Sequence, residues 1–126
     1  MIEIRAKRVY LPASPGDGLR VLIDRVWPRG KSKEQVQADL WLKELAPTTA
    51  LRKWFAHDRS RWVGFRQRYF AELDANPAGV AKLLEIPANA PLTLLYSARD
   101  MECNQAVALR DYLLARFNQS SRSPKA

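Results

Sequence analysis

The pattern of apolar and polar residues predicts three strands that differ in burial. Residues 2–9 alternate apolar with charged side chains, which is typical of a half-buried strand at the edge of a sheet. Residues 19–24 are a short aliphatic run after a Pro- and Gly-rich loop at 11–18, and they predict a more central strand. Residues 91–96 predict the clearest strand in the chain.

Helical spacing and capping residues predict five helices. Ser32 and Gln35 form a capping-box pattern at the first helix. Thr48 or Thr49 caps the second helix, and Asp58 caps the third. The expected ranges are 32–38, 48–55, 58–73, 77–86 and 104–117.

The order of these elements predicts a single α/β domain over residues 1–117, with a small, mostly parallel sheet and helices packed on its faces. Residues 39–45 fit either a third strand or a continued helix, and the sequence leaves both open. Residues 118–126 have no apolar side chains to bury, so they are expected to form a disordered basic tail.

Two loops are expected to face one crevice. The strands that end at Ile23 and Tyr96 are separated by several helices, and a long helical connection usually returns the chain parallel to its start. Both strands then end at the same edge of the sheet, outside which α/β proteins bind their ligands. Residues 24–30 and 97–104 should therefore lie together.

The side chains of these loops suit an anionic ligand. Arg25, Arg29 and Arg99 offer forked, permanently charged donors for phosphate or carboxylate. Trp27 can stack on a ring and, with Tyr96, would close the pocket. We therefore expect a preorganised pocket for a phosphorylated or nucleotide-like anion.

Candidates for catalysis come from the same region. Asp24 and Asp100 can accept hydrogen bonds from ligand hydroxyls or act as a general base, and His57 can act as an acid or base. Asn104 is a further ligand-binding candidate at the start of the last helix. The position of Asp100 and Asn104 before the last helix fits a helix cap equally well, and the choice between a hydrolase or transferase and a binding protein stays open.

Charge and composition narrow the partners. The formal net charge of +8 and pI near 10.1 favour anionic partners, either a small ligand or nucleic acid. The single cysteine and the lack of a long apolar run predict a cytoplasmic protein that does not span a membrane. One histidine and one cysteine exclude most zinc sites, which need several such ligands, and the sequence indicates no cofactor.

Two other functions remain open. Arginines and aromatic residues interleave over 52–68, which suits a nucleic-acid-associated regulatory protein, although on a helical wheel the arginines flank an aromatic stripe on both sides. The opposite face carries Ser60, Gly64 and Ala71, small residues that suit packing by another helix or by a second subunit of a dimeric interaction module.

The segments DGLRVLIDRVWPRG, WLKELAPTTALRKWFAHD, FRQRYFAEL and LTLLYSARDMECNQAVAL together resemble the bacterial YeaO-like family, classed as domain of unknown function 488. The resemblance covers nearly the whole chain and implies a small α/β domain without an assigned activity. It implies that the family's characteristic positions here are Asp24, Arg25, Trp27, Pro28, Arg29, Gly30, Trp54, His57, Asp58, Tyr96, Arg99, Asp100 and Asn104.

Overall fold

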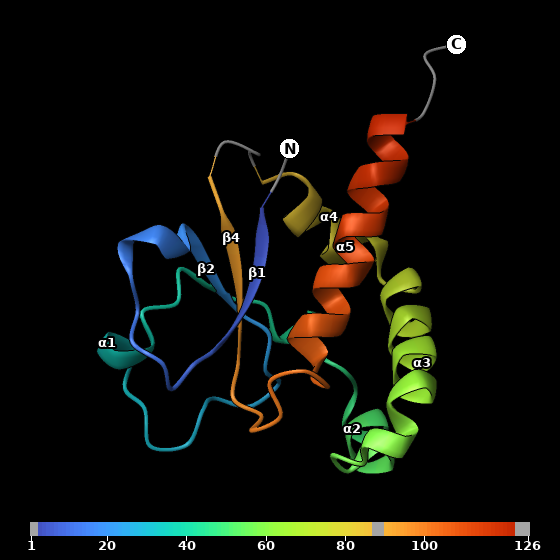
Figure 1. Ribbon diagram of the computed structural model, residues 1–126, viewed down its shortest axis with the longest axis horizontal. Helices are drawn as coiled ribbons and strands as arrows, with labels where there is room; N and C mark the ends of the chain where they lie inside the picture. The colour runs from blue at the N-terminus through green and yellow to red at the C-terminus, as the bar shows by residue number, and fades with distance from the viewer. Residues whose placement is uncertain (1–2, 87–89, 123–126) are drawn as a thin grey trace.

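A parallel sheet forms the centre of the molecule (Figure 1). The computed structural model describes residues 3–86 and 90–122 of the 126-residue chain. Within these residues the sheet has four strands in the order β1-β4-β2-β3, and every neighbouring pair is parallel. The strands are β1 (Ile4–Arg8), β2 (Leu19–Leu22), β3 (Leu40–Trp41) and β4 (Leu92–Tyr96). The predicted α/β class is confirmed, with β1 at an edge and β4 in the interior.

The register brings three strand ends to one level. Leu22 pairs with Leu95 between β2 and β4, and Arg8 pairs with Tyr96 between β1 and β4. The backbone continues this alignment, because the Ile23 amide donates to the Leu95 carbonyl at 3.0 Å. The loops that follow β2 and β4 therefore leave the same edge of the sheet, as expected from the helical connections.

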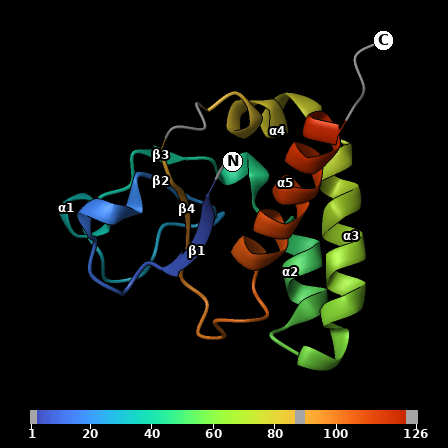
Figure 2. The ribbon, with the colours of Figure 1, turned by 45° about the horizontal axis from the view of Figure 1, so that its top comes forward.

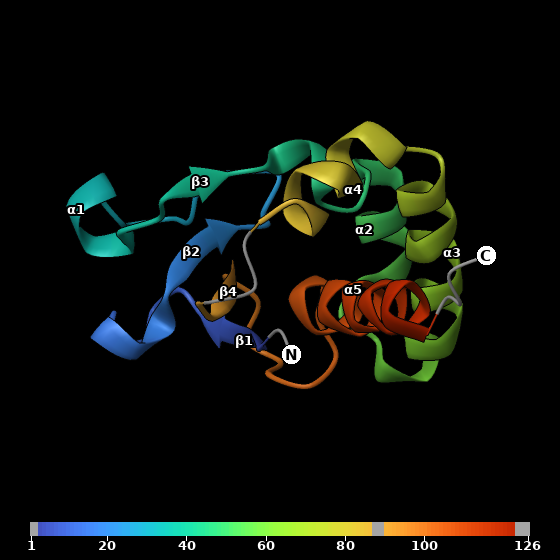
Figure 3. The ribbon, with the colours of Figure 1, turned by 90° about the horizontal axis from the view of Figure 1, so that it is seen from above.

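Four of the five described α-helices lie on one side of the sheet, and α1 lies on the other (Figure 3). On the crowded side, α3 and α5 run side by side (Figure 2). The predicted caps Ser32 and Asp58 both cap helical turns, and Thr48 rather than Thr49 caps α2. The helices are α1 (Lys33–Val36), α2 (Thr49–Phe55), α3 (Trp62–Asp74), α4 (Pro77–Leu84) and α5 (Gln105–Arg122).

The segment that the sequence left open, 39–45, begins as a strand. Leu40 and Trp41 form β3, and the Leu42 amide extends the pairing to the Leu22 carbonyl at 3.0 Å. A 3-10 turn over Lys43–Leu45 then leads away from the sheet. The strand is short because its side chains alternate only once before the chain must turn toward the helical layer.

The aliphatic run of β2 serves two cores. Val21 and Ile23 belong to the main core between the sheet and α2–α5, whereas Leu22 faces the other side. There it joins a far-face cluster composed of Val9, Leu22, Val36 and Leu95. A strand buried on both faces needs continuous apolar residues rather than alternation.

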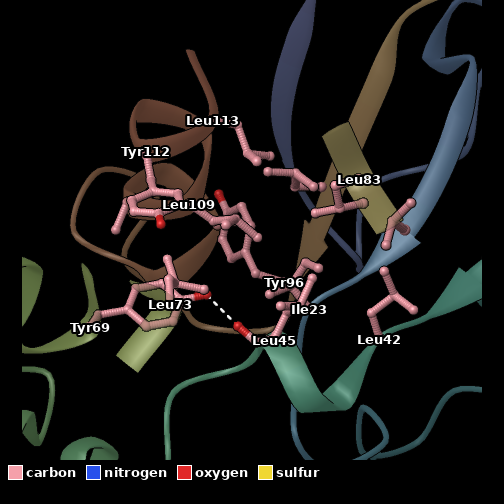
Figure 4. Packing of buried hydrophobic residues seen from close by; sticks show 14 of the residues in the cluster. Ile23, Leu42, Leu45, Tyr69, Leu73, Leu83, Tyr96, Leu109, Tyr112 and Leu113 are labelled. Atoms are coloured by element: carbon pink, nitrogen blue, oxygen red, sulfur yellow. Dashed lines mark hydrogen bonds between the residues drawn. The ribbon is translucent and has the colours of Figure 1, made fainter. Parts of the chain in front are cut away.

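The aromatic stripe of α3 anchors the main core (Figure 4). Tyr69 is completely buried, and its hydroxyl donates to the Leu45 carbonyl at 2.5 Å. Phe65 and Leu73 are also buried, as their helical spacing predicts. Burial raises the pKa of Tyr69, so the phenol stays a neutral donor.

The small-residue face of α3 is covered at Gly64 by Trp54 of α2. A Cβ atom at Gly64 would lie 2.9 Å from the Trp54 ring. The guanidinium groups of Arg61 and Arg68 lie 5.3 and 4.0 Å from the centre of the same ring. At this position the face packs against a helix of the same chain, which was one of the two alternatives left open.

The last helix extends beyond the predicted domain end. Its backbone is helical to Arg122, whereas the sequence placed the end of the domain at Phe117. The helix thus includes 118–122, part of the segment expected to be a tail, and residues 123–126 of that segment lie outside the described residues. No helix in the described part of the chain is long and apolar enough to cross a lipid bilayer.

Candidate functional site

A cleft of about 840 Å³ opens at the edge where β1, β2 and β4 end. The loops after β2 and β4 form two of its walls, at the lower end of the molecule in Figure 1. Its volume lies within the roughly 300–1,000 Å³ that small-ligand sites occupy. Seven of the nine site residues predicted from the sequence line it: Asp24, Arg25, Trp27, Arg29, His57, Arg99 and Asp100.

Two arginines of the cleft are held by backbone carbonyls. Arg25 donates to the Pro47 and Ala46 carbonyls at 3.0 and 2.9 Å, so it ties the loop after β2 to the entry of α2. Arg8, at the end of β1, donates to the Ala98 carbonyl at 3.0 Å. These arginines add positive charge, but part of their hydrogen-bonding capacity is already used within the protein.

The other three arginines of the cleft are free to meet a ligand. Arg29, Arg52 and Arg99 are all exposed and line the cleft. Within residues 3–86 and 90–122, none of their guanidinium groups makes an ion pair or a hydrogen bond. Because a guanidinium group presents up to five donors, three unpaired ones around one cavity favour a multiply charged anion.

The loop after β2 is stiffened by its aromatic residue. Trp27 donates to the Lys31 carbonyl at 2.6 Å and packs edge-on against Trp41, with ring centres 5.3 Å apart. Tyr10 donates to the Arg29 carbonyl at 3.0 Å. The loop thus holds its backbone in place while the Arg29 side chain remains exposed, which lowers the entropy lost on binding.

Asp24 lies buried beneath the cleft. One carboxylate oxygen accepts from Gln105 Nε2 at 2.6 Å. The other is buried and accepts no hydrogen bond of good geometry from the described residues, although the adjacent Ser97 offsets part of the cost of burial. Burial raises the pKa of Asp24 above its ordinary value of 3.8. A desolvated carboxyl with a raised pKa beside a cleft is typical of functional sites.

Asp100 is committed to holding two loops together. The forked guanidinium group of Arg59 donates to both of its carboxylate oxygens at 2.8 Å. The amides of Cys103 and Glu102 donate to the same carboxylate at 3.0 and 2.9 Å. Hydrogen bonds from the Cys103 amide, the Glu102 amide and Arg59 lower the pKa of Asp100, so it is a poor general base.

His57 projects from a tight turn after α2. Both Ala56 and His57 adopt left-handed conformations, with φ of 49° and 57°. Such conformations are costly for residues with a Cβ, and they persist where the surroundings demand them. His57 is exposed at the cleft, but Asp58 does not form a dyad with it, because the Asp58 carboxylate accepts from the amide and hydroxyl of Ser60.

Tyr96 and Asn104 were predicted as ligand-binding residues, but neither lines the cleft; Asn104 instead lines a smaller pocket beside it. Tyr96 is 2% exposed and lies in the main core (Figure 4), because its position in β4 points it toward α5. Asn104 is the cap of α5: its side chain accepts from the Val107 amide and donates to the Asp100 carbonyl. Both ends of its amide are therefore occupied.

Several lining residues were missed from the sequence. Site residues gather where parallel strands end. This rule would have found Ser97, which follows β4, and also Arg8 if it had been applied to β1. Arg52 and Gln105 sit on helices, where no local pattern marks them. In the described part of the chain, no three His, Cys, Asp or Glu side chains cluster as metal ligands.

Fold and cleft together define a single-domain α/β protein with arginines gathered at the carboxyl edge of a parallel sheet. Residues 3–126 match a family model described as "Inactive DUF488-N3 subclade". The uncharacterized protein YeaO of Escherichia coli (strain K12) is 44% identical over 112 residues, which cover 89% of this chain and 97% of YeaO. The chain therefore belongs to the YeaO-like DUF488 family.

More distant relatives span the same length. The uncharacterized proteins Mb3100c of Mycobacterium bovis and Rv3073c of Mycobacterium tuberculosis are each 34% identical over 114 residues. These alignments cover 90% of this chain and 96% of each relative. No solved structure matches the chain.

Proposed function

We propose that the protein binds a small phosphorylated anion in the arginine-lined cleft. The observation that carries this proposal is the set of three exposed arginines, Arg29, Arg52 and Arg99, without protein partners among the described residues. Elsewhere the arginines are used within the protein: Arg66 pairs with Asp111, and Arg116 pairs with Asp74. Unpaired cations that converge on one cavity favour a ligand with several negative oxygens, such as a phosphate ester.

Binding without catalysis is better supported than a hydrolase or transferase activity. Asp100 is occupied by Arg59 and two amides, and the free oxygen of Asp24 is buried rather than open to the cleft. His57 is the one catalytic candidate whose side chain is exposed there. The name of the matching family model, an inactive subclade, points in the same direction.

Nucleic-acid binding has less support. Arg59 pairs with Asp100 and Glu102, and Arg61 and Arg68 stack on Trp54. These arginines, which made residues 52–68 resemble a basic surface in sequence, are engaged with protein groups. Dimerisation through the small-residue face of α3 is also less supported, because the contact at Gly64 is internal.

The test is a titration of the purified protein with inorganic phosphate, pyrophosphate, sugar phosphates, nucleotides and short DNA and RNA, followed by thermal unfolding and calorimetry. A ligand at a hundred times its Kd adds about 2.7 kcal/mol to the free energy of unfolding. Arg29→Ala and Arg99→Ala should each weaken the anion at least about tenfold, because a charge-assisted hydrogen bond contributes roughly 1.5–3 kcal/mol.

Arg68→Ala is the matched control, since it removes one exposed arginine that does not line the cleft. It should leave the affinity for a small anion nearly unchanged. Equal loss in all three variants would show that net charge, not the cleft, attracts the ligand. Binding of polynucleotide alone, with affinity that falls steeply as salt rises, would replace the proposal with the nucleic-acid alternative.

A further inference from the structure

A smaller pocket of about 240 Å³ opens beside the cleft. The two cavities lie next to each other, because they share five lining residues: Pro47, Arg52, His57, Ala98 and Gln105. The smaller one lies below the roughly 300–1,000 Å³ that whole ligands occupy, so it suits part of a ligand whose remainder sits in the cleft.

The inner wall of this pocket is apolar and aromatic. Phe55 and Phe65 stack with ring centres 4.4 Å apart, and both line the pocket. Pro47, Ala98 and Cys103 complete the apolar part of the lining, and Lys53 adds a cation beside Arg52. Five arginines line the neighbouring cleft. The two adjoining cavities therefore combine an arginine-rich side with an aromatic side.

His57 stands where the two cavities meet. Its ring centre lies 6.5 Å from that of Phe55, at an angle of 49°, and the residue lines both cavities. Arg52 also borders both, so a positive charge lies next to the apolar walls. Flat rings are favoured by such walls, because they can pack on aromatic faces and edges while an attached anion reaches the arginines.

We propose that the pocket receives the aromatic ring of a phosphate ester whose phosphate is held in the arginine-lined cleft. This inference rests on the proposed function and narrows the ligand class from any small phosphorylated anion to one with a single aromatic ring next to the phosphate. Arg29 and Arg99 bind the phosphate, and Phe55, Phe65 and His57 contact the ring.

The experiment compares inorganic phosphate, glycerol phosphate and phenyl phosphate by calorimetry at constant salt. Burying a phenyl ring between aromatic walls should tighten binding about tenfold or more over glycerol phosphate. Cys103→Phe fills the pocket and should abolish this gain while phosphate itself still binds. Cys103→Ala is the matched control, which leaves the pocket open and should keep the gain.

A second readout uses the wild-type chain. Cys103 is its single cysteine, so alkylation by iodoacetamide followed by mass spectrometry reports on this pocket alone. Phenyl phosphate should slow the alkylation of Cys103, and inorganic phosphate at equal occupancy should not. This measurement does not depend on the folding of any variant.

The outcomes separate the two proposals. If phosphate binds through Arg99 but the phenyl group adds nothing and leaves Cys103 unprotected, this inference is wrong and the proposed function stands. If the phenyl gain survives Cys103→Phe, the ring lies elsewhere and the inference is also overturned. If none of the phosphates binds, the proposed function itself fails.

Discussion

Replacing Asp24 by asparagine should stabilise the protein at neutral pH. The buried oxygen of Asp24 accepts no hydrogen bond of good geometry from the described residues, and its pKa is raised by burial. A buried polar group without a partner costs about 1–3 kcal/mol, and a charged one costs more. Asp24→Asn removes the charge while its amide oxygen can still accept from Gln105.

The gain comes only from the lost charge, because the asparagine amide still leaves one buried polar group without a partner, so we expect about 1 kcal/mol at pH 7. For a domain of this length that corresponds to an increase in Tm of roughly 4 °C. Urea unfolding and calorimetry measure both quantities. Asp58→Asn is the matched control, because Asp58 is exposed and asparagine caps helices as well as aspartate does, so it should leave the free energy of unfolding nearly unchanged.

The pH dependence gives the sharper test. Because the pKa of Asp24 is raised in the folded state, the folded protein holds this proton more tightly than the unfolded chain. The wild type should therefore lose stability relative to Asp24→Asn as pH rises from 3.8, the ordinary pKa, through the raised pKa. Below pH 3.8 the advantage of the variant should shrink.

A variant that is less stable than wild type at every pH would refute this reasoning, since it would show that the carboxylate is well compensated. A ligand anion close to Asp24 adds a second expectation. Like charges repel, so wild-type affinity for phosphate should fall as Asp24 ionises, and Asp24→Asn should bind phosphate more tightly at pH 7. At pH 7, Asp24→Asn should therefore raise both the free energy of unfolding and the affinity for phosphate. A substitution that only disturbed the packing would not raise both.

Two further pairs of substitutions test the fold by differential scanning calorimetry. Gly18→Ala should destabilise more than Gly30→Ala by about 1–3 kcal/mol: both glycines have positive φ, but only at Gly18 would the new Cβ clash with the Pro91 carbonyl, at 2.1 Å. Equal losses would mean that the contact relaxes freely. Tyr69→Phe should cost about 1–2 kcal/mol, because it leaves the buried Leu45 carbonyl without its donor. Tyr112→Phe should cost less, since its partner Asp74 is largely exposed and can be hydrated; a larger loss there would contradict this.

The sequence predicted the elements well because their signals are local. The capping box at Ser32 and the helical spacing of Phe65 and Tyr69 each depend on residues a turn or two apart. The meeting of the two loops was also predictable, because the parallel return of a helical connection is a general rule. The segment 39–45 was not, because a two-residue strand leaves no measurable period.

The site was predicted only in part, because a local sequence pattern does not show which way a side chain points or which distant residue it pairs with. Tyr96 directly precedes the loop that carries Arg99, but its position in β4 points its side chain into the main core. Asp100 looked available until the structure paired it with Arg59, forty-one residues away. Arg52 joins the cleft through the packing of α2, a contact that no spacing rule reveals.

The two walls of the cleft pack on hydrophobic cores of different size. The loop with Trp27 packs on the far-face cluster, which has four buried members, whereas Phe55 and the start of α5 belong to the main core, which has twenty among the described residues. The segments that cover the smaller cluster, the Trp27 loop and α1, should detach from the sheet at a lower free energy than global unfolding. A ligand that contacts both walls of the cleft would be lost whenever either wall opens. Ligand binding should therefore couple the local unfolding of the two walls, so that they open together.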